Sequence, residues 1–155
     1  MHRRTLALRL ALYTSLLLSA LLCVTMNRSA FAGGGPENVL LVVNVNSWAS
    51  QTIANHYAAW RQIPASNILY VNWRFADEPL PVADFRRLLI GPIMQELRQR
   101  QIDEQIDYIV YSSDFPTQID LTADLQSANA PEQLSRIGAL TGMTYLWNQT
   151  LVGNP

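Results

Sequence analysis

Three groups of polar residues follow apolar, strand-like runs of this sequence, and they contain the side chains best suited to contact a ligand. In chain order they are Asn44, Asn46 and Ser47, then Asn72 and Arg74, then Ser112, Ser113 and Asp114. Open α/β sheets bind ligands at the carboxyl ends of their strands, so residues in these positions are candidate ligand contacts. Strand ends are also polar because they meet solvent and cap helices, and both interpretations stay open.

Ser113 would be the nucleophile if the third group were catalytic. A serine nucleophile needs a base within hydrogen-bond reach and donors for an oxyanion. His56 is the one histidine after residue 32, and it falls in the middle of a predicted helix. The stretch SSDF also differs from the G-x-S-x-G pattern of a nucleophile elbow. We therefore expect no serine triad, and a surface or packing role for His56.

Metal and cofactor sites have weak support in the sequence. Asp114, Asp120 and Asp124 follow one another closely and could offer oxygen ligands to calcium, but their spacing lacks the D-x-D-x-D-G pattern. The stretch VNVNSWAS has no glycine where dinucleotide and phosphate loops require one. Cys23 is the only cysteine, and we expect it to leave with the amino-terminal segment. We expect no cofactor and no metal.

Alternating strands and helices would position the three polar groups. Apolar, β-branched runs predict strands at residues 39–43, 67–73 and 108–112, the first of them buried on both faces. Helical periodicity predicts helices near residues 47–64, 85–97 and 132–152, with breaks at Gly91-Pro92, Gly138 and Gly142. In the first helix, Ile53, Tyr57 and Trp60 repeat at helical spacing, with Ala54 and Ala58 beside them.

This order of elements predicts an α/β domain, a three-layer Rossmann-like parallel sheet with flanking helices. Three strands make a thin sheet, and the sequence stops just after a predicted helix, where a fourth strand would follow. We therefore interpret residues 39–155 as the first part of a larger α/β domain. An uncovered sheet edge would then be open to self-association.

The stretch VYSSDFPTQID predicts how the third strand ends. Pro116 disfavours helical geometry at Phe115, so the chain cannot run directly from the strand into a helix. We expect the apolar Phe115 to fold over the end of the sheet. Asp114 would then face Asn44, Asn46 and Arg74 across the edge.

Charge composition narrows the class of partner. All 11 basic residues are arginines, four of them precede residue 33, and the remaining 7 face 12 acidic residues. This composition argues against nucleic acid as a partner, because phosphate binding depends on clustered lysine and arginine. The arginines of the second predicted helix mostly fall off its apolar stripe, which predicts a solvated face for Arg86, Arg87, Arg98 and Arg100.

The first 32 residues have the pattern of a secretory signal peptide. MHRRTLALR is basic, Leu10 to Met26 is apolar, and Ala30 and Ala32 are the small residues that a signal peptidase reads. We expect cleavage after Ala32, a flexible leader at residues 33–38, and a periplasmic or extracellular protein with no stable membrane insertion. The alternative is an uncleaved helix that anchors the protein in the inner membrane, since a bilayer core needs ~20 apolar residues.

Several stretches together resemble one uncharacterised exported bacterial family. They are NVLLVVNVNSWASQTIANHYAAWRQIPASNIL, DYIVYSSDFPTQIDL and LTGMTYLWNQTLVGNP, and the resemblance covers residues 36–155. The family occurs in species with exosortase-type protein sorting. The resemblance implies an exported protein of unassigned activity whose relatives are longer, so that this chain corresponds to their first half.

We therefore expect an exported bacterial envelope protein with a non-catalytic or incomplete α/β binding domain. The alternative is a truncated hydrolase, caspase-like or of another type, whose catalytic residues lie partly in missing carboxyl-terminal sequence. Caspase-like peptidases place histidine and cysteine at strand ends of a similar sheet. Neither residue type follows a predicted strand here, which argues against peptidase activity in this chain.

Overall fold

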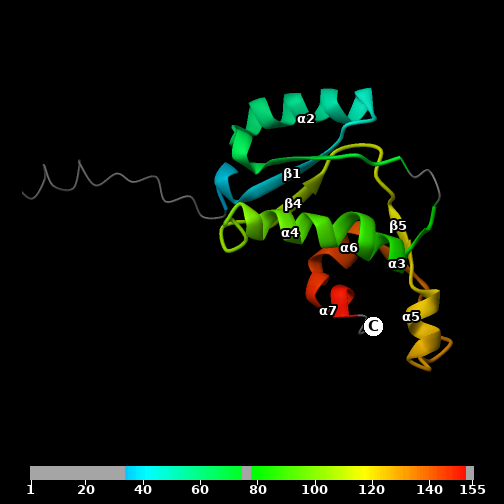
Figure 1. The fold of residues 1–155 in the computed structure, drawn as a ribbon. Coiled ribbons are helices and arrows are strands. Elements are labelled where there is room, and N and C mark those ends of the chain that lie inside the picture. The colour runs from blue at the N-terminus through cyan, green and yellow to red at the C-terminus, as the bar shows by residue number, and fades with distance from the viewer. Residues whose placement is uncertain (1–33, 75–77, 153–155) are drawn as a thin grey trace, which may run out of the picture. The chain divides into compact units, whose positions relative to one another are not determined.

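The computed structural model describes residues 34–74 and 78–152, whose arrangement is shown in Figure 1. Its central feature is a parallel sheet of three strands in the order β2-β1-β4, which we call sheet A. The strands are β1 (Val39–Asn44), β2 (Ile68–Val71) and β4 (Tyr108–Tyr111). Leu41 pairs with Ile68 on one side and with Val110 on the other. The predicted α/β class with a parallel sheet is therefore confirmed.

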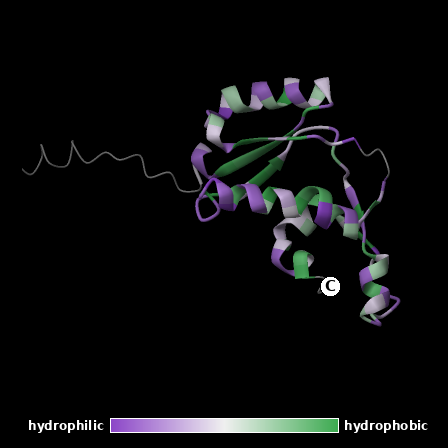
Figure 2. Ribbon diagram, in the orientation of Figure 1, coloured by the Kyte–Doolittle hydropathy of each residue, from purple (hydrophilic) through white to green (hydrophobic). Residues whose placement is uncertain are grey.

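Helices cover both faces of sheet A (Figure 1). One face carries α2 (Trp48–Arg61), and the other carries the continuous segment of α3 (Val82–Phe85), η3 (Arg86–Ile90) and α4 (Gly91–Gln99). Every residue of β1 is buried, because alternate side chains point to opposite faces and both faces are covered. Figure 2 shows that this strand is hydrophobic along most of its length, whereas α2 is mixed.

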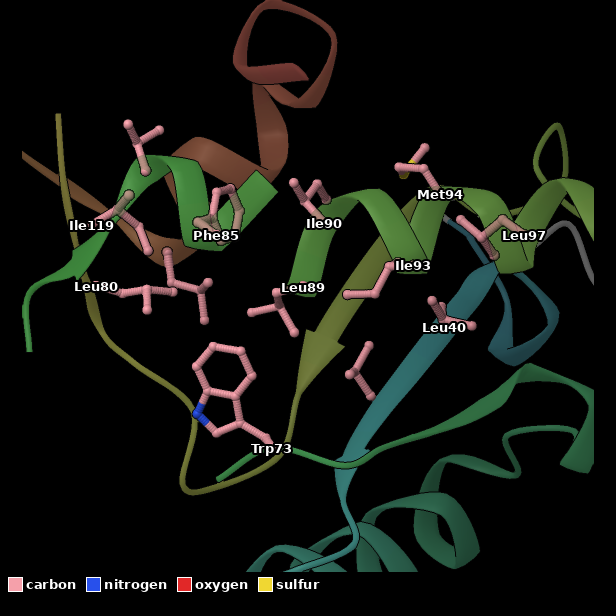
Figure 3. Close-up of a cluster of buried hydrophobic side chains, with 13 residues drawn as sticks. Leu40, Trp73, Leu80, Phe85, Leu89, Ile90, Ile93, Met94, Leu97 and Ile119 are labelled. Carbon is pink, nitrogen blue, oxygen red and sulfur yellow. The ribbon is translucent and has the colours of Figure 1, made fainter. Parts of the chain in front are cut away.

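The larger core lies between sheet A and the segment from α3 to α4 (Figure 3). Phe85, Leu89, Ile93 and Leu97 are buried there, and they belong to the apolar stripe that the sequence predicts for this helix. Leu40 of β1 contributes to the same cluster from the sheet. The stripe therefore fixes which side of the helix faces the sheet.

The predicted break at Gly91-Pro92 corresponds to a change in helix type. Residues 86–90 form a π-helical turn, and α4 begins at Gly91 with Pro92 in its first turn. Proline has no N–H to donate to the preceding turn, and the hydrogen-bond pattern changes there, since Gly91 N donates to Arg86 O five residues earlier. A Cβ on Gly91 would lie 2.5 Å from the carbonyl oxygen of Arg86, so the turn requires glycine.

The helix α2 packs on sheet A mainly through small residues beside the apolar repeat seen in the sequence. Ala54 is buried, and Tyr57 and Ala58 are half-buried against the sheet. Of the large residues that repeat at helical spacing, Tyr57 packs against the sheet, whereas Ile53 and Trp60 are 51% and 85% exposed. Alanine side chains let the helix approach the sheet closely, and the 3.6-residue period then turns Ile53 and Trp60 outward.

A second small sheet, sheet B, lies in segments where the sequence predicts no strand. It consists of β3 (Leu80–Pro81), β5 (Gln118–Asp120) and β6 (Ile137–Ala139). The pairing of β3 with β5 is parallel, and that of β5 with β6 is antiparallel. Leu80 and Ile119 enter the larger core, so sheet B extends the hydrophobic cluster beyond sheet A.

The last part of the described chain is less helical than predicted. Three short helices are present, α5 (Thr122–Ser127), α6 (Leu140–Tyr145) and α7 (Trp147–Val152). The predicted helix over residues 132–152 is right only from Leu140 onward, because residues 137–139 pair with β5 instead. Gly138 lies in β6 and Gly142 lies inside α6, so the break between the last two helices falls at Leu146.

Two short 3-10 helices, η1 (Pro36–Asn38) and η2 (Ala65–Asn67), precede β1 and β2. η1 falls in the segment predicted as a leader, and its Glu37 carbonyl accepts from Asn67 Nδ2 at 2.7 Å and Gln105 Nε2 at 2.6 Å. The predicted signal peptide at residues 1–32 lies outside the described residues. Over residues 34–74 and 78–152, no helix has the length and apolarity needed to cross a membrane.

Candidate functional site

The carboxyl ends of β1 and β4 meet at one edge of sheet A, as the sequence predicts. Asn44 Nδ2 donates to the main-chain oxygen of Asp114 at 3.1 Å, and Ser47 Oγ donates to the Asp114 carboxylate. Ser47 also caps α2, because its Oγ accepts from Ser50 N at 2.9 Å. Asp114 therefore connects the loop after β4 to the start of α2. We call this edge, with its eight predicted residues, the rim.

The end of β2 joins the same rim through amide side chains. Asn46 Nδ2 donates to Asn72 Oδ1 at 2.6 Å and to the main-chain oxygen of Trp73 at 3.0 Å. Arg74 Nε donates to the same Asn72 oxygen at 3.1 Å. The predicted approach of Asp114 to the first strand is thus confirmed, but its carboxylate contacts Ser47 and forms no ion pair with Arg74.

The two serines after β4 have different environments. Ser112 Oγ donates to the main-chain oxygen of Ser50 at 2.7 Å, which ties the strand end to α2. Ser113 Oγ is buried and has no hydrogen-bond partner among the described residues. His56 is exposed on α2, and the described residues give Ser113 no base.

Phe115 covers the end of the sheet, which confirms the predicted fold of this loop. Its ring lies 5.4 Å from that of Tyr111, edge to face, and 6.1 Å from that of Trp73. Asp114 precedes it with a φ of 62°, in the left-handed region, and remains exposed at the rim. The side chains of the rim mostly hydrogen-bond to one another, so the rim connects the ends of three strands.

The three aspartates considered as calcium ligands lie in different environments. Asp120 Oδ1 accepts from Thr122 N at 2.8 Å, and hydrogen bonds with Thr122 lower the pKa of this carboxyl. Asp124 forms a two-pronged ion pair with Arg86, so its charge is already compensated. Within the described ranges, no group of three potential metal ligands occurs. The sequence predicts a solvated face for Arg86, and the ion pair shows that this prediction is wrong.

A groove beside β4 was not anticipated from the sequence. Its volume is about 580 Å³, and it is lined by residues of α4, the loop before β4, β4 itself and α6, together with Trp147. Apolar side chains line much of it, including Leu97, Ile106 and Ile109. In Figure 1, α4 and α6 lie near β4, which is one of the two outer strands of sheet A. We call this hollow the β4 groove.

Three charged side chains line the β4 groove, namely Arg98, Asp103 and Asp107. None of them forms an ion pair within the part of the chain that the structure describes. Near the groove, the hydroxyls of Tyr111 and Thr144 lie 3.0 Å apart, which holds α6 beside β4. Burial raises the pKa of Tyr111 to about 12, and the hydrogen bond with Thr144 lowers it by less.

Comparisons with known proteins add no relative. No family model matches the chain, and neither a curated protein nor a solved structure matches it. The resemblance to an exported bacterial family therefore stays a prediction.

Proposed function

We propose that this chain is an exported bacterial envelope protein whose α/β domain acts by binding, and that the β4 groove holds the ligand. The signal-peptide pattern of residues 1–32 supports export, and the apolar lining of the groove supports binding. The observation that carries the proposal is the groove of about 580 Å³ whose three charged side chains have no ion pair in the described part of the chain.

The β4 groove is a better candidate than the rim because its three charged side chains form no ion pair within the described residues and can contact a ligand. At the rim, Asn46 and Ser47 already bond to groups of neighbouring strand ends. A ligand there would have to break those bonds, at a cost close to what it gains. Arg98 and Asp107 in the groove have no ion pair to break, so a ligand that binds there displaces only water from their charged groups.

Affinity capture with a variant whose groove is filled tests this function. Thr141 is exposed and lines the groove, so Thr141→Trp should fill it. Gly142→Ala is the matched control on the next residue, because a Cβ there would meet no atom within 4 Å. We expect immobilised protein and the control to retain the same molecule from an envelope extract, and Thr141→Trp to lose it. Equal retention by all three would refute a site in this groove.

A further inference from the structure

We propose that the ligand of the β4 groove is an extended polypeptide segment that adds a strand to sheet A and places a basic side chain beside Asp103 and Asp107. This inference rests on the proposed function and names the class of its ligand. It combines three observations, which concern the free edge of β4, the shape of the groove and its charge.

The outer edge of β4 presents main-chain groups with no strand beside them in the described part of the chain. Ser112 N donates to Val42 O on β1 at 2.9 Å. Strands hydrogen-bond to a neighbour through alternate residues, so Val110 also faces β1. The N–H and C=O of Ile109 therefore point to the outer edge, where the groove lies. An added strand satisfies such groups directly, which is how extended peptides join sheet edges.

The surroundings of this edge favour a single segment over a second sheet. The groove is bordered by residues of α4 on one side and of α6 on the other, and the contact of Tyr111 with Thr144 keeps α6 close to β4. A second copy of the chain would bring its own helices against these two. One extended segment has no flanking helices, so it needs only the width of one strand, about 4.8 Å.

Charge in the groove selects the side chains of that segment. Asp107 directly precedes β4 and Asp103 lies in the same loop, so two carboxylates mark the amino end of the strand. Arg98 supplies one opposite charge, which leaves the groove with a net charge of −1. A lysine or arginine of the ligand would compensate this charge, whereas an acidic residue there would be repelled.

An array of hexapeptides tests the inference. Its members alternate valine or isoleucine with threonine and carry lysine, arginine or glutamate at one end, and the probe is the exported protein itself. We expect basic members to bind, and glutamate members to bind more weakly. A copy of the best peptide with N-methylated alternate amides keeps its side chains but loses the donors of an added strand, so it should not bind.

Two protein variants locate the charge contribution. Asp103→Asn combined with Asp107→Asn removes both carboxylates from exposed positions, and we expect the basic peptide to bind about fivefold more weakly. Glu104→Gln is the control, because this exposed residue lies in the same loop but does not line the groove. Equal effects of the two variants would overturn the charge assignment.

The outcomes separate this inference from the proposed function. If no array member binds, or if the N-methylated peptide binds as well as its parent, strand addition is wrong. Loss of envelope capture in Thr141→Trp would then still support a groove ligand of another class. If light scattering shows a dimer whose formation Thr141→Trp abolishes, a second copy occupies the edge and the peptide proposal fails.

Discussion

Arg86 joins three elements that are distant in sequence. Its guanidinium pairs with Asp124 of α5, and its Nε donates to the main-chain oxygen of Thr150 in α7. Both partners of the ion pair are largely buried, with side-chain exposures of 20% and 15%. Removing one partner leaves the other charge uncompensated in a place where water can only partly solvate it.

We therefore predict that Asp124→Asn lowers the free energy of unfolding by about 1–2 kcal/mol, between the values for exposed and fully buried pairs. Asp84→Asn is the matched control, because Asp84 pairs with Arg87 at an exposed site. This control should change stability by less than about 0.5 kcal/mol. Urea denaturation measures the free energy of unfolding of both variants. Equal losses of stability would show that the ion pair with Arg86 contributes no more than an exposed pair does.

Tyr111 makes the stability of the folded protein depend on pH in the alkaline range. Burial raises its pKa from 10.0 to about 12, so the folded chain keeps the phenol proton at pH values where the unfolded chain releases it. The stability contributed by the neutral, buried phenol is present below pH 10.0 and is lost as the pH rises toward about 12.

We predict that, relative to Tyr111→Phe, the wild-type protein loses roughly 1.4 kcal/mol of stability per pH unit across this window. Phenylalanine has no proton to release, so the difference between the two proteins isolates this group. Tyr70→Phe is the control at a 57% exposed tyrosine, and it should follow the wild-type profile. Parallel profiles for wild type and Tyr111→Phe would mean that Tyr111 titrates as an exposed tyrosine does.

At the scale of elements, the π-helical turn before α4 depends on one glycine. A Cβ at position 91 would lie 2.5 Å from the carbonyl oxygen of Arg86, and backbone atoms cannot move aside cheaply. We predict that Gly91→Ala destabilises the domain by about 1–3 kcal/mol.

Gly142→Ala is the contrasting change, because its Cβ would meet no atom within 4 Å inside α6. Alanine restricts the unfolded chain more than glycine does, so this variant should gain about 0.4–1 kcal/mol. Thermal melts followed by circular dichroism compare the two. If Gly91→Ala left the melting temperature unchanged, the π-helical turn would be able to relax into an ordinary α-helix.

Some elements could be predicted from the sequence because their signals are local. The continuous apolar run of β1 predicts a strand buried on both faces, and parallel topology then brings polar strand ends such as Asn44 and Asp114 together. The strands of sheet B contain two or three residues each, too few for a periodic pattern. The helical repeat of α2 does not by itself identify the buried side, because alanines, not the larger Ile53 and Trp60, contact the sheet.

The β4 groove could not be predicted for a different reason. Its walls come from separate segments, represented by Leu97, Asp107 and Thr141, which only the folded chain brings together. The aromatic residues that line it, among them Tyr108 and Tyr145, have no distinctive spacing in the sequence. The nearest sequence signal was the expectation of an open sheet edge, which indicated a place of association but not a groove.

For the molecule as a whole, the proposed export would decide in which compartment a ligand is bound. We predict that protein recovered from the bacterial envelope begins at Gly33, because Ala30 and Ala32 match the residues that a signal peptidase reads. Intact-mass measurement decides this directly. A chain that retains residues 1–32 would contradict cleavage and favour a membrane anchor.

The central claim is that the edge of β4 is where this protein binds its ligand. Amide hydrogen exchange, measured by NMR with and without the best basic hexapeptide, tests it residue by residue. We predict that exchange at Ile109, whose N–H points to the free edge, slows at least about tenfold on binding, as expected for an amide that gains a main-chain hydrogen bond. The rim amides of Asn46 and Ser113 should not change. Protection at the rim with no change at Ile109 would contradict the account.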